Sequence, residues 1–240
     1  MRLTHGRTEI ELHLLKEGRG TAALLLHELG GSHADLNNVA FDGWQGAVYA
    51  LDFAGHGASA HVAGNGYSPE YFLADADIAM SAAGVEAKDE FVVIGAGIGG
   101  YVALMLAAAR SERVAAALVL PGRGLAGGGL VPDFGKPAYQ GLDAWEAEIA
   151  DLASHYQPGT DPMVSACERD LRPAPYVEEL AAGVRRLLLS DTVATSDEVP
   201  SWWSLAMNAP GYESIDAQLD DSFDNALSAL QGDGNEENAA

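Results

Sequence analysis

One stretch constrains the fold more than any other part of the chain: a strand, a glycine turn and an apolar helix in direct succession. Residues 91–107 read FVVIGAGIGGYVALMLA. The run Phe91–Ile94 is typical of a buried strand, and Tyr101–Arg110 predicts a helix with almost no polar face. Four of the six residues between 95 and 100 are glycine, which allows a sharp reversal. A buried strand followed at once by a buried helix is the repeating unit of a parallel sheet.

The rest of the chain continues this alternation. Residues 10–14 alternate apolar and polar side chains, as a half-buried strand does. Ser68, Pro69 and Glu70 form a helix start, and this helix is predicted to run to about Ala83. The other predicted strands are 22–26, 47–51, 115–120, 185–189 and 212–215, and the other predicted helices are 142–154, 175–182, 200–207 and 221–230. The fold class is therefore α/β, with a mostly parallel central sheet and helices on both faces.

The length of 240 residues suits one domain of this class. We assign residues 1–120 and 185–231 to the core. The segment 121–184 begins with the glycine-rich PGRGLAGGG and is interpreted as a short helical cap inserted over the sheet edge. Residues 232–240 are small and acidic and are predicted to be a disordered tail.

Charge and cysteine content exclude several partner classes. With 13 basic and 35 acidic residues the net charge is −22, so the protein is acidic and we expect neither nucleic acid nor a membrane as partner. The single cysteine, Cys167, cannot form an internal disulfide, and no histidine or cysteine spacing predicts a metal site. We expect no metal and no cofactor. The N-terminus lacks a signal peptide and no apolar run spans a membrane, which predicts a cytoplasmic protein of undetermined oligomeric state.

Four segments, in order, resemble the α/β-hydrolase fold family. They are LLLHELGGS (24–32), LDFAGHGAS (51–59), the stretch 91–107 and RLLLSDTVATSDEVP (186–200). The family's nucleophile elbow, G-x-S-x-G, aligns with 95–99. The resemblance implies an oxyanion loop at 27–32 and an acid after the strand at 185–189, for which Asp197 and Asp191 are the candidates.

This sequence departs from the family at the positions that carry the chemistry. Gly97 stands where the resemblance places the nucleophile, so the turn can form but offers no side chain for attack. The family's catalytic histidine follows the last strand, yet no histidine follows His155, and residues 218–222 read QLDDS. The resemblance therefore implies a pseudohydrolase, in which the nucleophile and histidine positions are not retained and hydrolytic activity is uncertain.

The oxyanion loop is altered as well. Glu28 follows His27 where the family usually has glycine, and an inward carboxylate would oppose a developing oxyanion. His27 is expected to anchor the loop by hydrogen bonding. We predict that the residual pocket is lined by His27, Glu28, Leu29 and Ile98, and that the missing side chain at Gly97 leaves space for a small ligand.

Two other functions fit the same residues. One is an active esterase-type hydrolase whose nucleophile lies elsewhere in the chain. The other is nucleotide binding, because Gly95–Gly100 also matches GxGxxG between a strand and a helix. No acidic residue ends the next strand, Leu118–Leu120, to hold a ribose, which counts against nucleotide binding.

Overall fold

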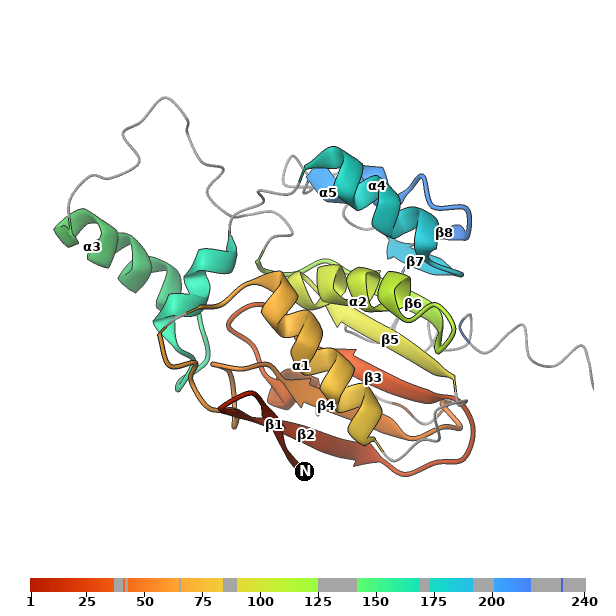
Figure 1. Cartoon of the computed structure of the whole chain (residues 1–240), viewed down its shortest axis with the longest axis horizontal. Coiled ribbons are helices and arrows are strands. Elements are labelled where there is room, and N and C mark those ends of the chain that lie inside the picture. Colours follow the sequence, from red (N-terminus) through yellow and green to blue (C-terminus); the bar gives the residue numbers. More distant parts are fainter. Residues whose placement is uncertain are drawn as a thin grey trace, which may run out of the picture.

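A computed structural model of the chain describes residues 1–36, 41, 43–64, 66–83, 90–124, 142–168, 173–191, 201–216 and 230. Its centre is an eight-stranded sheet in the order β1-β2-β4-β3-β5-β6-β7-β8 (Figure 1). The pairs β1–β2 and β2–β4 are antiparallel and the other pairs are parallel. The strands are β1 (Arg2–His5), β2 (Thr8–Lys16), β3 (Ala22–Leu26), β4 (Val48–Asp52), β5 (Phe91–Ala96), β6 (Val114–Leu120), β7 (Leu187–Ser190) and β8 (Tyr212–Ile215). The predicted α/β class with a mostly parallel sheet is confirmed.

Helices and short 3-10 turns connect these strands. They are η1 (His33–Leu36), α1 (Pro69–Ala82), α2 (Ile98–Ala109), α3 (Leu142–Ala153), η2 (Pro162–Glu168), α4 (Ala174–Gly183) and α5 (Ser201–Ala206). Ser68 caps α1 as predicted, because its side-chain oxygen accepts the Tyr71 N–H at 3.2 Å. The predicted helix 221–230 lies outside the described residues apart from Leu230.

The first strand was missed in the sequence, where only one N-terminal strand was predicted. β1 and β2 form a hairpin whose turn contains Gly6 at φ 61°. That backbone conformation favours glycine and closes a tight turn between two strands.

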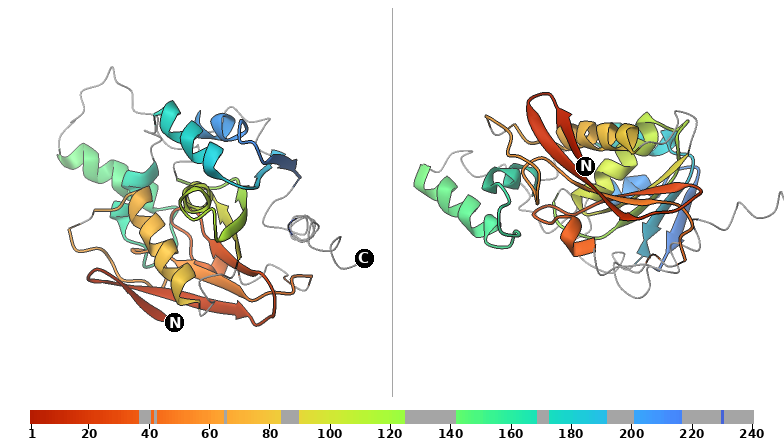
Figure 2. Two further views of the ribbon diagram at one scale, coloured as in Figure 1. Left: turned by 45° about the vertical axis from the view of Figure 1, so that its right-hand side comes forward. Right: turned by 90° about the horizontal axis from the view of Figure 1, so that it is seen from below.

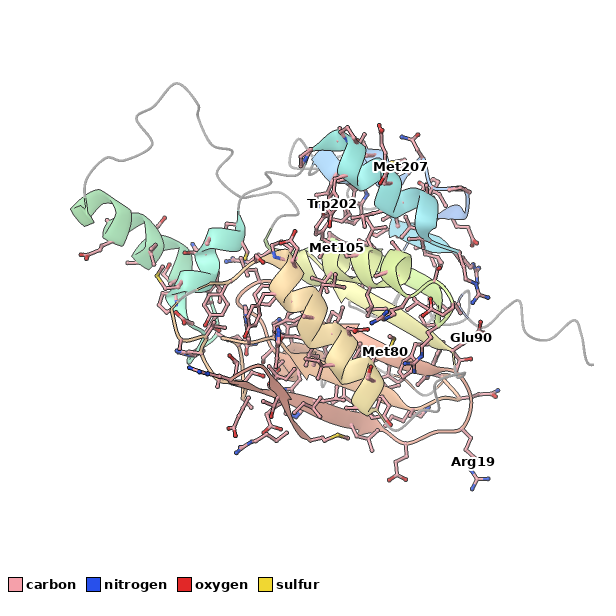
Figure 3. All side chains as sticks on the ribbon, viewed as in Figure 1. Arg19, Met80, Glu90, Met105, Trp202 and Met207 are labelled. Atoms are coloured by element: carbon pink, nitrogen blue, oxygen red, sulfur yellow. The ribbon has the colours of Figure 1, made fainter. Side chains whose placement is uncertain are left out.

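The strands bury both faces, since alternate residues of β3 belong to two separate apolar clusters. Leu24 and Leu26 belong to the cluster that includes side chains of α1, α2, α4 and α5, whereas Leu25 belongs to the cluster of Leu36, Phe41 and Trp44 on the opposite face. Within the helical layer, the ring centroid of Trp202 on α5 lies 5.0 Å from that of Tyr101 on α2. Figure 3 shows Trp202 above α2, which carries Met105. The site described below therefore rests on a rigid, closely packed frame.

The segment interpreted from sequence as a cap divides into two parts in space. α3 and η2 pack on each other at one end of the molecule, while α4 packs against α2 and α5 (Figures 1 and 2). The boundaries 121–184 stay a prediction. No helix in the described part of the chain is long and apolar enough to cross a membrane.

Candidate functional site

The turn between β5 and α2 has the geometry of a nucleophile elbow. Gly97 lies at its tip with φ 53° and ψ −123°, directly before the first residue of α2. Strand and helix approach so closely that a Cβ on Gly95 would lie 2.1 Å from the carbonyl oxygen of Gly99. Glycine at 95 is therefore required by packing, and glycine at 97 occupies the strained tip without a side chain.

Two backbone N–H groups converge beside this turn, and both are occupied by the chain itself. The carbonyl oxygen of Arg123 accepts the Ile98 N–H at 2.9 Å and the Leu29 N–H at 3.2 Å. One donor follows the nucleophile position and the other comes from the loop after β3, which is the composition of an oxyanion hole. Both donors are aligned on one oxygen atom, and that atom is a peptide carbonyl of this chain.

The backbone around Arg123 also fills the space next to Gly97. A Cβ on Gly97 would lie 2.1 Å from the Arg123 carbonyl oxygen and 2.6 Å from the carbonyl carbon of Gly122. The sequence predicted open space at this point, and that prediction is wrong, because the missing side chain is replaced by main chain. We call residues Pro121–Gly124 the plug segment.

Two carboxylates hold the plug segment from the other side. Glu28 points into the site, as the sequence suggested, and its Oε2 accepts the Arg123 N–H at 2.8 Å. Glu168 accepts the Gly124 N–H and also the Tyr156 hydroxyl, the latter at 2.9 Å. Burial raises the pKa of Glu168 above its ordinary value. Both carboxylates are committed to binding the protein's own backbone.

His27 has a structural role, as predicted from its place at the end of a buried strand. Its Nδ1 bonds the Glu28 carbonyl oxygen at 2.6 Å, and its Nε2 accepts the Phe53 N–H at 3.1 Å. Burial lowers its pKa. With both ring nitrogens engaged by the backbone, His27 holds the oxyanion loop against β4 and is not available as a general base.

The candidate acids are not brought to the turn by any described contact. Asp191 follows β7 directly and is exposed. Asp197 and residues 218–222 lie outside the described residues, so the acid position stays a prediction. His155, the last histidine, is exposed beyond α3.

One cluster was not predicted from the sequence, where no histidine or cysteine spacing indicated a metal site. His13, His33 and Asp52 each offer a ligand atom, and these atoms lie within 4.8 Å of one another. They come from β2, η1 and β4, so no short spacing in the sequence reveals them. The plug segment was missed for a different reason: a backbone carbonyl has no signature in residue type.

The N–H groups at the start of α2 bear on nucleotide binding. Gly97 N–H donates to the Leu120 carbonyl and Ile98 N–H to that of Arg123. A phosphate would need these donors, so their engagement counts against nucleotide binding at Gly95–Gly100.

Comparison with known proteins gives a consistent picture of the fold. A model described as "Alpha/beta hydrolase family" matches residues 23–230. Solved structures include Est816, described as an N-acyl homoserine lactone degrading enzyme, at 22% identity and TM-score 0.67, covering 97% of this chain and 99% of that one. The enol-lactonase from Burkholderia xenovorans LB400 has 17% identity and TM-score 0.61 over 97% of both chains.

A third structure is that of the bottromycin epimerase BotH in complex with bottromycin A2, at 17% identity and TM-score 0.56 over 94% of both chains. At sequence identities of 17% to 22%, these similarities show a shared fold and nothing more. The comparison with curated protein sequences gave no match.

Proposed function

Because the chain belongs to the alpha/beta hydrolase family, we propose that it is a member without the Ser-His-Asp triad, a pseudohydrolase that binds a ligand or partner through its oxyanion hole. A hydrolase of this family attacks its substrate with a side chain at the elbow and activates that side chain with a histidine. Here the elbow residue is Gly97, and no histidine follows His155. The resemblance of the four motifs therefore extends to the fold and the hole but not to the reacting groups.

The observation that carries the proposal is the occupied hole. The Arg123 carbonyl accepts both oxyanion-hole N–H groups, at 2.9 and 3.2 Å, while the main chain of residues 122 and 123 fills the place of a nucleophile. The two donors are thereby kept aligned on an oxygen atom in the absence of substrate. A ligand that binds there must carry a neutral carbonyl oxygen and must displace the plug segment.

A role other than hydrolysis has a parallel among the similar structures. BotH, which shares this fold, is described as an epimerase. Function on this fold resides in the groups at the carboxyl ends of the strands and not in the fold itself. The Glu28 carboxylate opposes the build-up of negative charge on an oxygen in the hole, so the site suits binding of a neutral carbonyl better than acyl transfer.

An active esterase-type hydrolase is the second candidate, and the intact hole favours it. Preorganised donors stabilise an oxyanion wherever the attacking group comes from, including a residue outside the described part of the chain. The lactone-degrading activities named for Est816 and the Burkholderia enzyme would then indicate the substrate class.

Ester hydrolysis distinguishes the two. The purified protein is assayed with p-nitrophenyl esters from acetate to octanoate, and in parallel treated with a fluorophosphonate that labels activated serines. We expect no saturable turnover and no adduct. Turnover together with an adduct on any residue would overturn the pseudohydrolase and locate the missing nucleophile by mass spectrometry.

Ligand binding is then followed at the plug segment itself. The amide protons of Leu29 and Ile98 are hydrogen-bonded to the Arg123 carbonyl, so their NMR shifts report on its position. Lactones and short-chain amides serve as probes. A ligand in the hole shifts both resonances together, whereas a ligand elsewhere leaves them unchanged and contradicts binding at this site.

A further inference from the structure

Three side chains meet at a point where β2, β4 and the loop after β3 come together. Asp52 is the last residue of β4, His13 lies on β2 opposite Ala50, and His33 begins η1. Asp52 Oδ2 lies 3.1 Å from His13 Nε2 and 2.9 Å from His33 Nδ1. All three ligand atoms fall within 4.8 Å of one another.

The carboxylate is fixed while the two imidazoles reach solvent. The Asp52 side chain is fully buried, and its oxygens accept the backbone N–H of His33 at 2.7 Å and of Ala58 at 2.9 Å. The side chains of His13 and His33 are 25% and 24% exposed. An ion arriving from solvent would therefore meet two partly exposed imidazoles beside an oxygen whose position is already set.

We propose that His13, His33 and Asp52 bind a divalent transition-metal ion, with Zn²⁺ as the leading candidate. Two imidazoles and one carboxylate suit zinc and its neighbours in the first transition row, and they are poor ligands for Ca²⁺ or Mg²⁺. Three protein ligands leave at least one coordination position for water. The site does not depend on the proposed function of the oxyanion hole.

The stacking of the His13 and His33 rings requires them to move when a metal ion binds. His13 and His33 are stacked with centroids 3.5 Å apart and planes 11° from parallel. A metal ion lies close to the plane of each imidazole that binds it, so the rings must tilt apart on binding. Their exposure permits this tilt, and the ion replaces two hydrogen bonds to Asp52 with stronger coordination bonds.

Other histidine–carboxylate contacts in the described residues provide matched controls. His61 lies 3.6 Å from Asp161 and His5 lies 2.7 Å from Asp75, and each of these carboxylates has one histidine beside it. An acidic protein with exposed histidines binds some metal at its surface. A variant at His61, whose side chain is 55% exposed, measures that background.

The test is binding of Zn²⁺ and Co²⁺ to protein stripped with a chelator and dialysed. Titration calorimetry with Zn²⁺ is expected to give one ion per chain, and Co²⁺ is expected to give a visible absorption spectrum of low coordination number. His13→Gln and His33→Gln should each weaken Zn²⁺ binding by about tenfold or more. His61→Gln should leave the affinity unchanged.

Several results would overturn the site. Failure of the wild type to bind one Zn²⁺ per chain would do so. Equal Zn²⁺ affinities of the wild type and both cluster variants, or a loss of affinity in His61→Gln equal to theirs, would also do so. Because both imidazoles are partly exposed, each variant is expected to fold, which thermal unfolding without metal verifies. Zn²⁺ should then raise the Tm of the wild type more than that of either cluster variant.

Discussion

The turns after β4 and after β5 lie at the same edge of the sheet, but different groups hold them in place. The turn 52–59 is organised by side chains: Asp52 accepts the Ala58 N–H, and Ser59 Oγ donates to the Asp52 carbonyl at 2.6 Å. The turn 95–100 has no polar side chain and is held by main chain, above all by the Arg123 carbonyl. Both match motifs of one family, and only the second carries glycine at the position where that family's elbow places the nucleophile.

The difference teaches that a motif can survive for structural reasons alone. Burial by itself would raise the pKa of Asp52, but the N–H groups of Ala58 and His33 bring it below its ordinary value, so the carboxylate stays ionised and bonded. Losing it would leave the part-buried N–H groups of His33 and Ala58 without their acceptor. Glycine at 97 has no such cost, since the plug segment fills the space beside it and accepts the N–H groups of Leu29 and Ile98.

The largest effect is expected from removing the carboxylate of the first turn. Asp52→Ala leaves the part-buried N–H groups of His33 and Ala58 without their acceptor, so we expect a loss of about 2–4 kcal/mol in the free energy of unfolding. Urea denaturation measures it. The control is Asp77→Ala, which removes an exposed ion pair with Arg110 and should cost less than about 1 kcal/mol. Similar costs for both variants would erase the contrast between the turns.

Substitution of Gly97 in the second turn tests how tightly the surrounding main chain fills the space beside it. Gly97→Ser places a Cβ against the Arg123 carbonyl at a positive φ, so we expect a loss of about 1–3 kcal/mol in stability. Esterase activity should stay at trace level, because no histidine is placed to activate the hydroxyl. Gly97→Ala is the matched control, with the same clash and no hydroxyl. Robust turnover by the serine variant alone would reveal an unrecognised base.

His56 lies within the first turn, and its burial predicts how stability responds to acid. Burial lowers the pKa of His56 from 6.5 to about 3. Below pH 6.5 the unfolded chain therefore binds a proton at His56 that the native state does not bind, so the free energy of unfolding falls as the pH drops. Between pH 6.5 and 5 this histidine alone accounts for about 2 kcal/mol. Urea denaturation of wild type and His56→Gln at both pH values measures it. An unchanged pH dependence in the variant contradicts the prediction.

The smallest effect is expected at Glu28, which holds the plug segment by accepting the Arg123 N–H. Glu28→Gln replaces a charged acceptor of the Arg123 N–H by a neutral one, which should cost about 0.5–1 kcal/mol. Faster amide hydrogen exchange at Leu29 and Ile98 is the readout, because opening of the plug exposes both donors. Glu112→Gln, at an exposed position, should leave exchange at both unchanged.

Most of the fold follows from local pattern. Alternating and continuous apolar runs located β2 through β8, and Ser68 with Pro69 located the start of α1, because burial and capping leave a periodic signature. The hairpin of β1 was missed, since a four-residue edge strand has little pattern of its own. Burial of His27 was likewise predictable from its position at the end of an apolar strand.

What the sequence determined by itself is the chemistry that this turn lacks: residue type alone states that Gly97 has no nucleophile and that no histidine follows His155. Tertiary structure decided what takes its place. The Arg123 carbonyl enters the oxyanion hole, and His13, His33 and Asp52 meet from three separate elements. Hydrogen bonds of the main chain and contacts between distant side chains depend on how strands are ordered in the sheet, and no spacing along the chain encodes that order.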